Sequence, residues 1–324
     1  MHIKHTFLII CAMVTFTLTV AQNNTSSPYT RYGLGLLENN TFGRGQALGG
    51  SGIALRSNKT INRANPASFS AIDTLSQIFE FGLTGQIARL ESGSNQQYNN
   101  DVNFSYIGLA FPITKNIGFS LGVKPMSNVG YTYMLENDEP NIGMTTNYYT
   151  GYGGVSEAFI GVSGKVFENL SLGVNLSYLF GSMVHERVLQ FTENTDFSNF
   201  SSEEKISVNA VHPIFGVQYL LPLSESNSLL FGAVYELKTS LNAKQNFTSS
   251  KEVVGVLESV TGRDIGFEMP EAYGLGLTYE LKNKLTITSD YYVQNWGDSK
   301  FYNVTDTLQN TARLSAGIEY IPNY

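Results

Sequence analysis

The chain has 324 residues and a formal net charge of −7; glycine, phenylalanine and tyrosine are abundant, and only 15% of the residues are charged. No cluster of Lys and Arg stands out, which argues against a nucleic-acid-binding protein. Beyond the N-terminus no stretch approaches twenty apolar residues, which excludes a helical membrane protein. The class that remains is a large β-protein, either a soluble sandwich or an outer-membrane barrel.

Residues 1–21 have the pattern of a secretory signal peptide. Lys4 gives a basic start, residues 7–20 are mostly apolar, and the small residues that end at Ala21 suit a signal peptidase. The apolar run of about fourteen residues is short for a transmembrane helix, and a retained membrane anchor is the alternative. Cys11 is the only cysteine, so the exported part has no disulfide, which suits a bacterial envelope protein.

Residues 22–75 are rich in glycine and do not alternate like a strand. Asn65-Pro66-Ala67 is a turn signal that we expect to begin the first strand. Ahead of a barrel, such a segment either hangs as a disordered arm or folds inside the lumen as a plug. Three apolar residues favour packing inside: Leu48, Ile53 and Leu55.

Alternation of apolar and polar residues predicts long β-strands over the rest of the chain. In residues 170–180 every second residue is Leu, Val, Tyr or Phe, and the residues between them are Ser, Gly or Asn. The same pattern recurs at 117–124, 285–296 and 313–320. Such runs of about 8–12 residues suit tilted strands that cross a bilayer better than the strands of soluble sheets.

The polar face of these strands decides between the two classes. A soluble sandwich would carry more Lys and Glu on its outer face than the Gly, Ser, Asn and Thr found here. An apolar face with aromatic ends, opposite a small polar face, is typical of a barrel with lipid outside and a polar lumen. In lipid, only a closed barrel leaves no unpaired sheet edge. We therefore predict an all-β fold, an antiparallel transmembrane β-barrel over residues 76–324.

About twelve strands are expected, with short turns alternating with longer polar insertions near 91–101, 136–151 and 193–204 that we interpret as outer loops. The chain ends at a turn signal, Ile321 to Tyr324, so we expect that it lacks a closing C-terminal hairpin. The strands are predicted near 77–90, 102–111, 117–124, 129–135, 155–166, 170–190, 204–220, 228–247, 251–259, 268–281, 284–296 and 312–321.

Catalytic and metal chemistry are not indicated. Beyond the signal peptide the only histidines are His185 and His212; both lie in predicted strands, and His212-Pro213 is interpreted as a strand bulge. Neither has a cysteine beside it, nor a carboxylate at metal-ligand spacing except Glu186. No particular serine is singled out as the nucleophile of a catalytic triad. We therefore predict no enzyme activity, no cofactor and no metal site.

The order of these features resembles the outer-membrane transporters of long-chain fatty acids and other hydrocarbons (FadL/TodX-like), in the form found in the Bacteroidetes. The resemblance consists of short matches over nearly the whole exported chain. These are the start Ser27 to Gly33, the turn at Asn65-Pro66-Ala67, and the segments Ser289 to Trp296 and Arg313 to Asn323.

The resemblance implies a fourteen-stranded barrel with an N-terminal hatch inside the lumen. It also implies that ligand is captured outside, held in an apolar pocket and released through an opening in the wall. On this basis Asn65, Pro66 and Ala67 are expected to anchor the hatch where ligand passes.

A lateral exit requires a break in strand pairing. Pro125 has no N–H to donate to a neighbouring strand, and flexible residues follow it. We therefore select Pro125, Met126, Ser127 and Asn128 as candidates for the opening. An ordinary turn or bulge between strands is the alternative interpretation of this stretch.

The resulting hypothesis is a passive outer-membrane transporter in a Gram-negative bacterium, monomeric, with a hydrophobic small molecule and membrane lipid as its partners and no nucleic acid. Moving a fatty acid out of water yields about 0.8 kcal/mol for each methylene, so an apolar path needs no energy source. The alternative is a structural or scaffolding barrel that assists protein secretion or envelope assembly.

Overall fold

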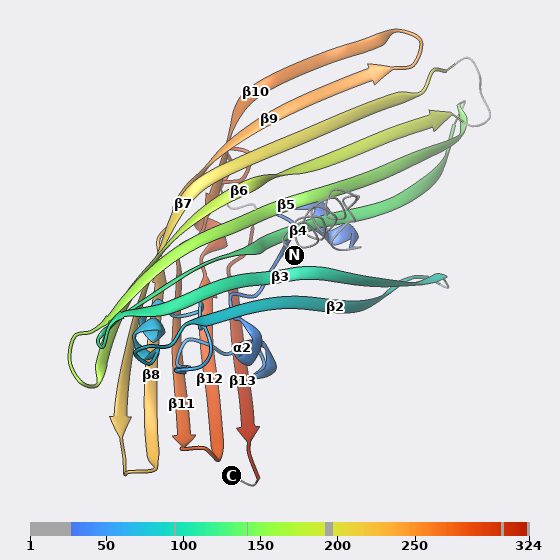
Figure 1. Ribbon diagram of the computed structural model, residues 1–324. Coiled ribbons are helices and arrows are strands. Elements are labelled where there is room, and N and C mark those ends of the chain that lie inside the picture. The colour runs from blue at the N-terminus through green and yellow to red at the C-terminus, as the bar shows by residue number, and fades with distance from the viewer. Residues whose placement is uncertain (1–26, 94, 141, 192–196, 306–307, 323–324) are drawn as a thin grey trace, which may run out of the picture.

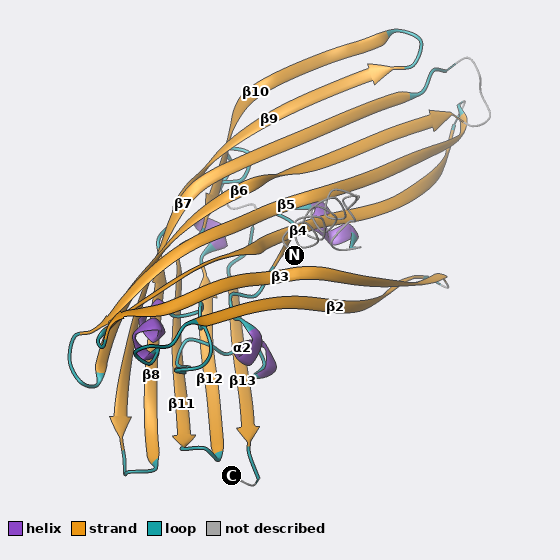
Figure 2. Ribbon diagram, viewed as in Figure 1, coloured by secondary structure: helices purple, strands orange, loops and turns teal. Residues whose placement is uncertain are grey.

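The computed structural model describes residues 27–93, 95–140, 142–191, 197–305 and 308–322. The predicted signal peptide lies outside the described residues. Antiparallel strands form one strongly curved sheet, and the N-terminal helices lie against it (Figures 1 and 2). The strands are β1 (Leu36–Leu37), β2 (Ile78–Ser92), β3 (Asn95–Thr114), β4 (Ile117–Glu139), β5 (Gly143–Lys165), β6 (Leu170–Phe191), β7 (Phe200–Pro222), β8 (Asn227–Glu236), β9 (Thr239–Lys251), β10 (Gly255–Met269), β11 (Ala272–Leu281), β12 (Leu285–Gln294) and β13 (Thr311–Tyr320).

The prediction of an all-β antiparallel barrel fold is confirmed as a curled half-barrel. Within the described residues it has thirteen strands, of which β1 has two residues and every other strand has ten or more. The order across the sheet is β13-β12-β11-β8-β7-β6-β5-β4-β3-β2, so that β2 and β13 lie at its two ends in the described part of the chain. The fourteen strands that the family resemblance implies are not found among these residues.

The sheet divides into two branches at β7. The lower half of β7, from Ile214, pairs with β8, and its upper half, up to Ser207, pairs with β9. In Figure 1, β9 and β10 accordingly lie in the upper part of the sheet, whereas β8, β11, β12 and β13 lie in the lower part. The prediction of one strand over 228–247 is therefore wrong, because the chain changes branch at Leu237–Lys238. The predicted bulge at His212 is also wrong, since the pairing of β7 with β6 continues there without a register shift.

Several strands are longer than predicted. Residues 117–139 form the single strand β4, although we expected two strands. Much of the predicted outer loops at 91–101 and 136–151 is strand, because β2 to β5 continue toward the hairpin tips. Those tips are polar on both faces, so the apolar alternation that marks a strand ends before the strand does.

Burial across the lower sheet is the reverse of that in a soluble protein. On β6, Leu172, Leu176 and Tyr178 are exposed, whereas Asn175 and Ser177 on the opposite face are fully buried. The same contrast recurs on β12 and β13, where Ile287 and Leu314 point outward. Large apolar side chains outside and small polar side chains inside are the arrangement of a lipid-facing barrel wall. No helix among the described residues is long and apolar enough to cross a membrane.

Residues 27–77, which we call the N-terminal segment, pack against the inner face of the sheet. Leu48, Ile53 and Leu55 are buried, as expected from their apolar character. The first long strand begins only at Ile78, so the prediction that the Asn65-Pro66-Ala67 turn starts it is wrong. The helices are η1 (Pro28–Arg31), α2 (Gly43–Ala47) and η2 (Pro66–Ala71) in this segment, and η3 (Trp296–Asp298) after β12.

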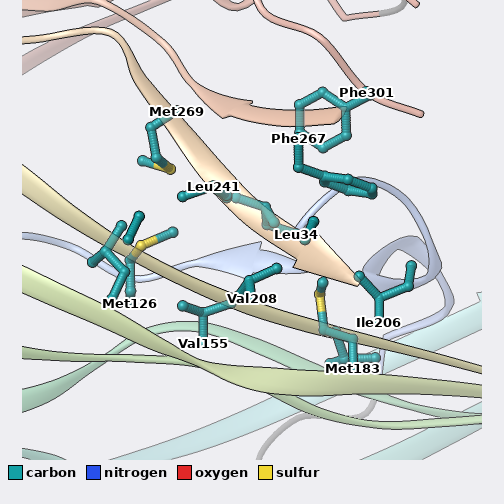
Figure 3. Packing of buried hydrophobic residues seen from close by; sticks show 14 of the residues in the cluster. Leu34, Met126, Val155, Met183, Ile206, Val208, Leu241, Phe267, Met269 and Phe301 are labelled. Carbon is teal, nitrogen blue, oxygen red and sulfur yellow. The ribbon is translucent and has the colours of Figure 1, made fainter. Parts of the chain in front are cut away.

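The inner face becomes apolar in the upper part of the sheet. Figure 3 shows side chains from β4, β5, β6, β7, β9 and β10 converging there, together with Leu34 of the N-terminal segment and Phe301 from the connection between β12 and β13. This cluster fills the upper lumen with hydrocarbon, in contrast to the polar lower lumen. Its members include Met126, Val155, Met183, Ile206, Val208, Leu241, Phe267 and Met269.

Candidate functional site

Asn65 fastens the N-terminal segment to the lower half of β7. Its Nδ2 donates to the carbonyl oxygens of Ile53 (2.7 Å) and of Val217 on β7 (3.1 Å). Its Oδ1 accepts from the backbone N–H of Ala67 (3.1 Å) and caps η2. Asn65, Pro66 and Ala67 are all buried. One side chain therefore joins two parts of the segment to the sheet.

Asn65→Ala is expected to destabilise the protein by about 1–3 kcal/mol, because the helix cap is lost and buried carbonyl oxygens lose their donor. The free energy of unfolding in lipid vesicles, measured by urea titration, checks this. Asn99→Ala serves as a control, since Asn99 is only partly buried on β3, where it accepts a bond from Gln97. Equal stability of Asn65→Ala and the wild type would contradict the anchoring role.

Two glycines of the wall make room for this anchor. Gly173 on β6 and Gly216 on β7 face each other in register. A Cβ on Gly216 would collide with Oδ1 of Asn65, and a Cβ on Gly173 would collide with the backbone of Pro66. Only glycine at these positions lets the segment lie this close to the sheet.

Gly216→Val is therefore expected to lower the free energy of unfolding by about 1–3 kcal/mol, the usual range for overpacking, and to loosen the N-terminal segment. Limited proteolysis near η2 measures the loosening. Gly85→Val on β2 is the matched control, because no atom lies within 4 Å of the added Cβ. A Gly216→Val protein as resistant as the Gly85→Val protein would refute the close-packing argument.

A buried ion pair lies two residues before the anchor. Nη2 of Arg63 donates to Oε1 of Glu157 on β5, which also accepts from Ser177 on β6. Lys124 on β4 is directly opposite Glu157 in the β4–β5 ladder and is buried too. The carboxylate of Glu157 thus faces two cations, one from the N-terminal segment and one from the wall.

A cavity of about 200 Å³ lies beside this ion pair. Its lining is amphipathic: Arg63 and Glu157 contribute charge, and Met126 and Leu179 contribute hydrocarbon. A second polar group lines it, in which Glu236 accepts from Tyr292 Oη (2.8 Å) and bonds His212 Nε2 (3.1 Å). Among the described residues no group of three or more potential metal ligands comes together.

The Pro125–Asn128 stretch lies where β3 and β4 separate. The ladder between these strands ends at Ile107 and Val123, and the register of β4 with β5 shifts between Pro125 and Ser127. The stretch therefore lies inside one continuous strand and not in a turn. The register shift is the kind of irregularity that the alternative interpretation, a bulge, predicted.

The edge of β4 that β3 leaves is covered by the N-terminal segment. In the two-residue strand β1, Leu36 and Leu37 pair with Asn128 and Ser127. The N–H of Glu38 donates to the carbonyl oxygen of Met126 (2.8 Å), and Asn128 Nδ2 donates to the Glu38 carboxylate (2.8 Å). The gap in the wall is thus lined by the segment that also carries Arg63.

Of the predicted site residues Met126 lines this cavity, whereas Asn65, Pro66 and Ala67 do not. The N-terminal segment reaches the cavity through Arg63, two positions before Asn65. Sequence reasoning missed Arg63, Glu157 and Asp290, whose Oδ2 accepts from the N–H groups of Gly52 (2.6 Å) and Ile53 (2.8 Å). The sequence did contain a signal for these contacts. Glu157 and Asp290 are carboxylates at inward positions of strands, and such a group needs a partner in the lumen.

Three solved structures share this architecture. The Pseudomonas putida toluene transporter TodX matches with a TM-score of 0.59 and 19% identity, over 88% of this chain and 81% of TodX. A TodX deltaS2S3 mutant, a monoaromatic hydrocarbon channel, gives 0.60 and 19%, over 90% and 80% of the two chains. A Pseudomonas aeruginosa FadL homologue gives 0.55 and 16%, over 89% and 78%.

The fold is therefore of the FadL/TodX class of β-barrels, as the sequence resemblance indicated. The chain belongs to the BamG family, whose model matches residues 2–324. This family bears a different name from the one that the short sequence matches suggested. Comparison with the curated proteins gives no match.

Proposed function

We propose that this protein is a passive outer-membrane channel for hydrophobic small molecules, such as long-chain fatty acids, in a Gram-negative bacterium. Residues 22–75 act as a hatch inside the barrel formed by residues 76–324, and ligand leaves through the wall at Pro125–Asn128. The partners are the ligand and membrane lipid; the channel is monomeric and carries out no chemical reaction. The apolar outer face of the sheet supports a place in lipid.

The observation that carries the proposal is the separation of β3 from β4 beside a lumen cavity. In a hydrocarbon environment an unpaired strand edge is costly, and β1 covers it. Because β1 contributes only two residues to this pairing, little must be broken to expose the gap. Two of the solved structures with this architecture, a toluene transporter and a monoaromatic hydrocarbon channel, support this class of cargo.

The size of the cavity sets what can enter without movement. A cavity of about 150 Å³ holds benzene, so the volume of about 200 Å³ found here suits one aromatic ring. A long-chain fatty acid requires the N-terminal segment to shift and open the apolar upper lumen. Burial of each methylene contributes about 0.8 kcal/mol of favourable free energy, which drives entry.

Uptake of labelled oleate and labelled toluene by cells with and without the protein tests the proposal. Uptake of at least one of them should fall in the cells that lack the protein. Deletion of Asn65 to Ala67 should also change uptake, because the hatch loses its anchor. Unchanged uptake of both compounds in cells without the protein would contradict a transport role.

A scaffolding role is the second candidate. The buried Arg63–Glu157 pair and the Asn65 anchor fill the lumen and hold the N-terminal segment to the wall. A permanently closed barrel would serve as a platform for other envelope proteins. A scaffolding role predicts normal uptake but defective envelope assembly in cells that lack the protein.

A further inference from the structure

A second hollow, which we call the lower cleft, lies at the end of the sheet that carries the C-terminus in Figure 1. Its volume is about 630 Å³. Residues 56–60 of the N-terminal segment form one side, and the turns after β7 and β11, near 222–228 and 280–286, form the other. The cavity beside Arg63 has a different lining, which shares no residue with the lower cleft.

Arg56 lines the lower cleft and is held by neutral oxygen atoms. Its Nη1 donates to Ser171 Oγ (2.9 Å) on β6 and its Nη2 to Ser70 Oγ (3.1 Å) on η2; the Oε1 of Gln218 on β7 lies 3.5 Å from Nη1. In the described part of the chain Arg56 makes no ion pair. These contacts fix the plane of the guanidinium while leaving its positive charge uncompensated.

Burial makes this charge costly. Desolvation lowers the pKa of Arg56 to about 10, so the group is still protonated at neutral pH. An anion beside it would offset the desolvation, since a guanidinium binds carboxylate or phosphate oxygens in a two-point geometry. Arg56 is therefore preorganised for an oxyanion that approaches from the cleft.

The surrounding charges favour the same ligand. Arg44 in the lower cleft already pairs with Glu319 (2.8 Å). The other charged residues of the lining are four cations and two carboxylates, and the excess is positive in a chain whose formal net charge is −7. They are Arg56, Lys59, Lys282, Lys284, Glu225 and Glu280.

We propose that the lower cleft binds an oxyanion, a carboxylate or a phosphate group, with Arg56 as its principal ligand. The lysines at the rim attract the anion by long-range electrostatics, and Arg56 holds it. If the protein carries amphiphiles, the cleft takes the carboxylate end of the ligand below the hatch; this part rests on the proposed function. The anion site itself does not depend on it.

Equilibrium dialysis of the full chain in lipid nanodiscs tests the site, with labelled inorganic phosphate, acetate and decanoate as probes and empty discs as the blank. At least one probe should bind at a single saturable site. Arg56→Gln should weaken this binding at least tenfold, and Arg56→Lys should weaken it less because the charge remains. Arg263→Gln on β10, where Arg263 is exposed, is the matched control and should bind as the wild type does.

Ser171→Asp gives a second variant that keeps Arg56. The new carboxylate would pair with the guanidinium and should abolish binding of the probes. The heat-dependent electrophoretic mobility typical of folded barrels identifies a variant that has not folded. Unchanged binding by folded Arg56→Gln or Ser171→Asp protein, or no saturable binding of any probe by the wild type, would overturn the proposal.

The three probes separate the sources of the oxyanion. Binding of phosphate or acetate alone indicates a site for a free anion or a phosphate headgroup. Preference for decanoate over acetate indicates an amphiphile. If the uptake assay shows no transport but phosphate still binds through Arg56, the proposed transport fails and the anion site stands.

Discussion

Glu157→Leu is expected to lower the free energy of unfolding by about 3–5 kcal/mol, since removing one partner leaves buried charges without compensation. Arg63 and Lys124 both face Glu157, and both are buried. Removal of the carboxylate therefore leaves two cations together in the lumen. Urea titration in lipid vesicles measures the change.

A double-mutant cycle separates the ion pair from simple packing. Arg63→Met combined with Glu157→Leu should be more stable than Glu157→Leu alone, because one of the stranded cations is gone. Glu91→Leu is the matched control: Glu91 pairs with Arg89 on the surface, where both side chains are half exposed. That change should cost less than about 1 kcal/mol. Equal effects at Glu157 and Glu91 would be incompatible with a buried pair.

Leu176→Arg should destabilise the protein by about 2–4 kcal/mol in a bilayer, because a charge is placed on the lipid-facing wall. Leu176 is 46% exposed and lies on the outer face of β6, well inside the apolar region. In a soluble β-protein, an arginine at so exposed a position would be almost neutral. Stability in vesicles, again by urea titration, therefore distinguishes lipid from water around this strand.

Phe167→Arg provides the control for this substitution. Phe167 is also exposed, but it lies in the turn between β5 and β6, near the end of the wall. The cost of a charge falls to about 0–1 kcal/mol near the membrane interface. Equal costs at positions 176 and 167 would contradict the proposed position of the bilayer.

The wall of the barrel could be predicted from local sequence, because lipid outside and polar atoms inside impose alternation on each strand. The branching of the sheet could not. Residues 228–247 alternate almost without interruption, and alternation reports which face a side chain takes but not which strand lies beside it. Only the structure shows that β8 and β9 extend opposite halves of β7.

The candidate site was predicted in part, for reasons that depend on the residue. Asn65-Pro66-Ala67 was selected by turn chemistry, which is local, and by the family resemblance, which implied an anchoring role. The partners of its contacts, Ile53 and Val217, were not foreseeable. Pro125 was selected because it lacks an N–H, and it does lie where the strand pairing is irregular. Arg63 was missed because its partner Glu157 is 94 residues away in sequence. Whether ligand passes at either place stays a prediction.

A reversible cross-link between the N-terminal segment and the wall tests the central claim most directly. Leu37→Cys with Ser127→Cys would join β1 to β4, since these residues are directly opposite in an antiparallel pair and the Cα separation of such pairs suits a disulfide. Thr278→Cys with Thr288→Cys is the matched control, because those hydroxyls lie 2.8 Å apart within the wall itself.

We predict that oxidation of the first pair reduces uptake of the transported compound to the background and that a reductant restores it. Oxidation of the control pair should change nothing. Full uptake through a protein whose β1 is covalently held to β4 would contradict a channel that opens by release of the N-terminal segment.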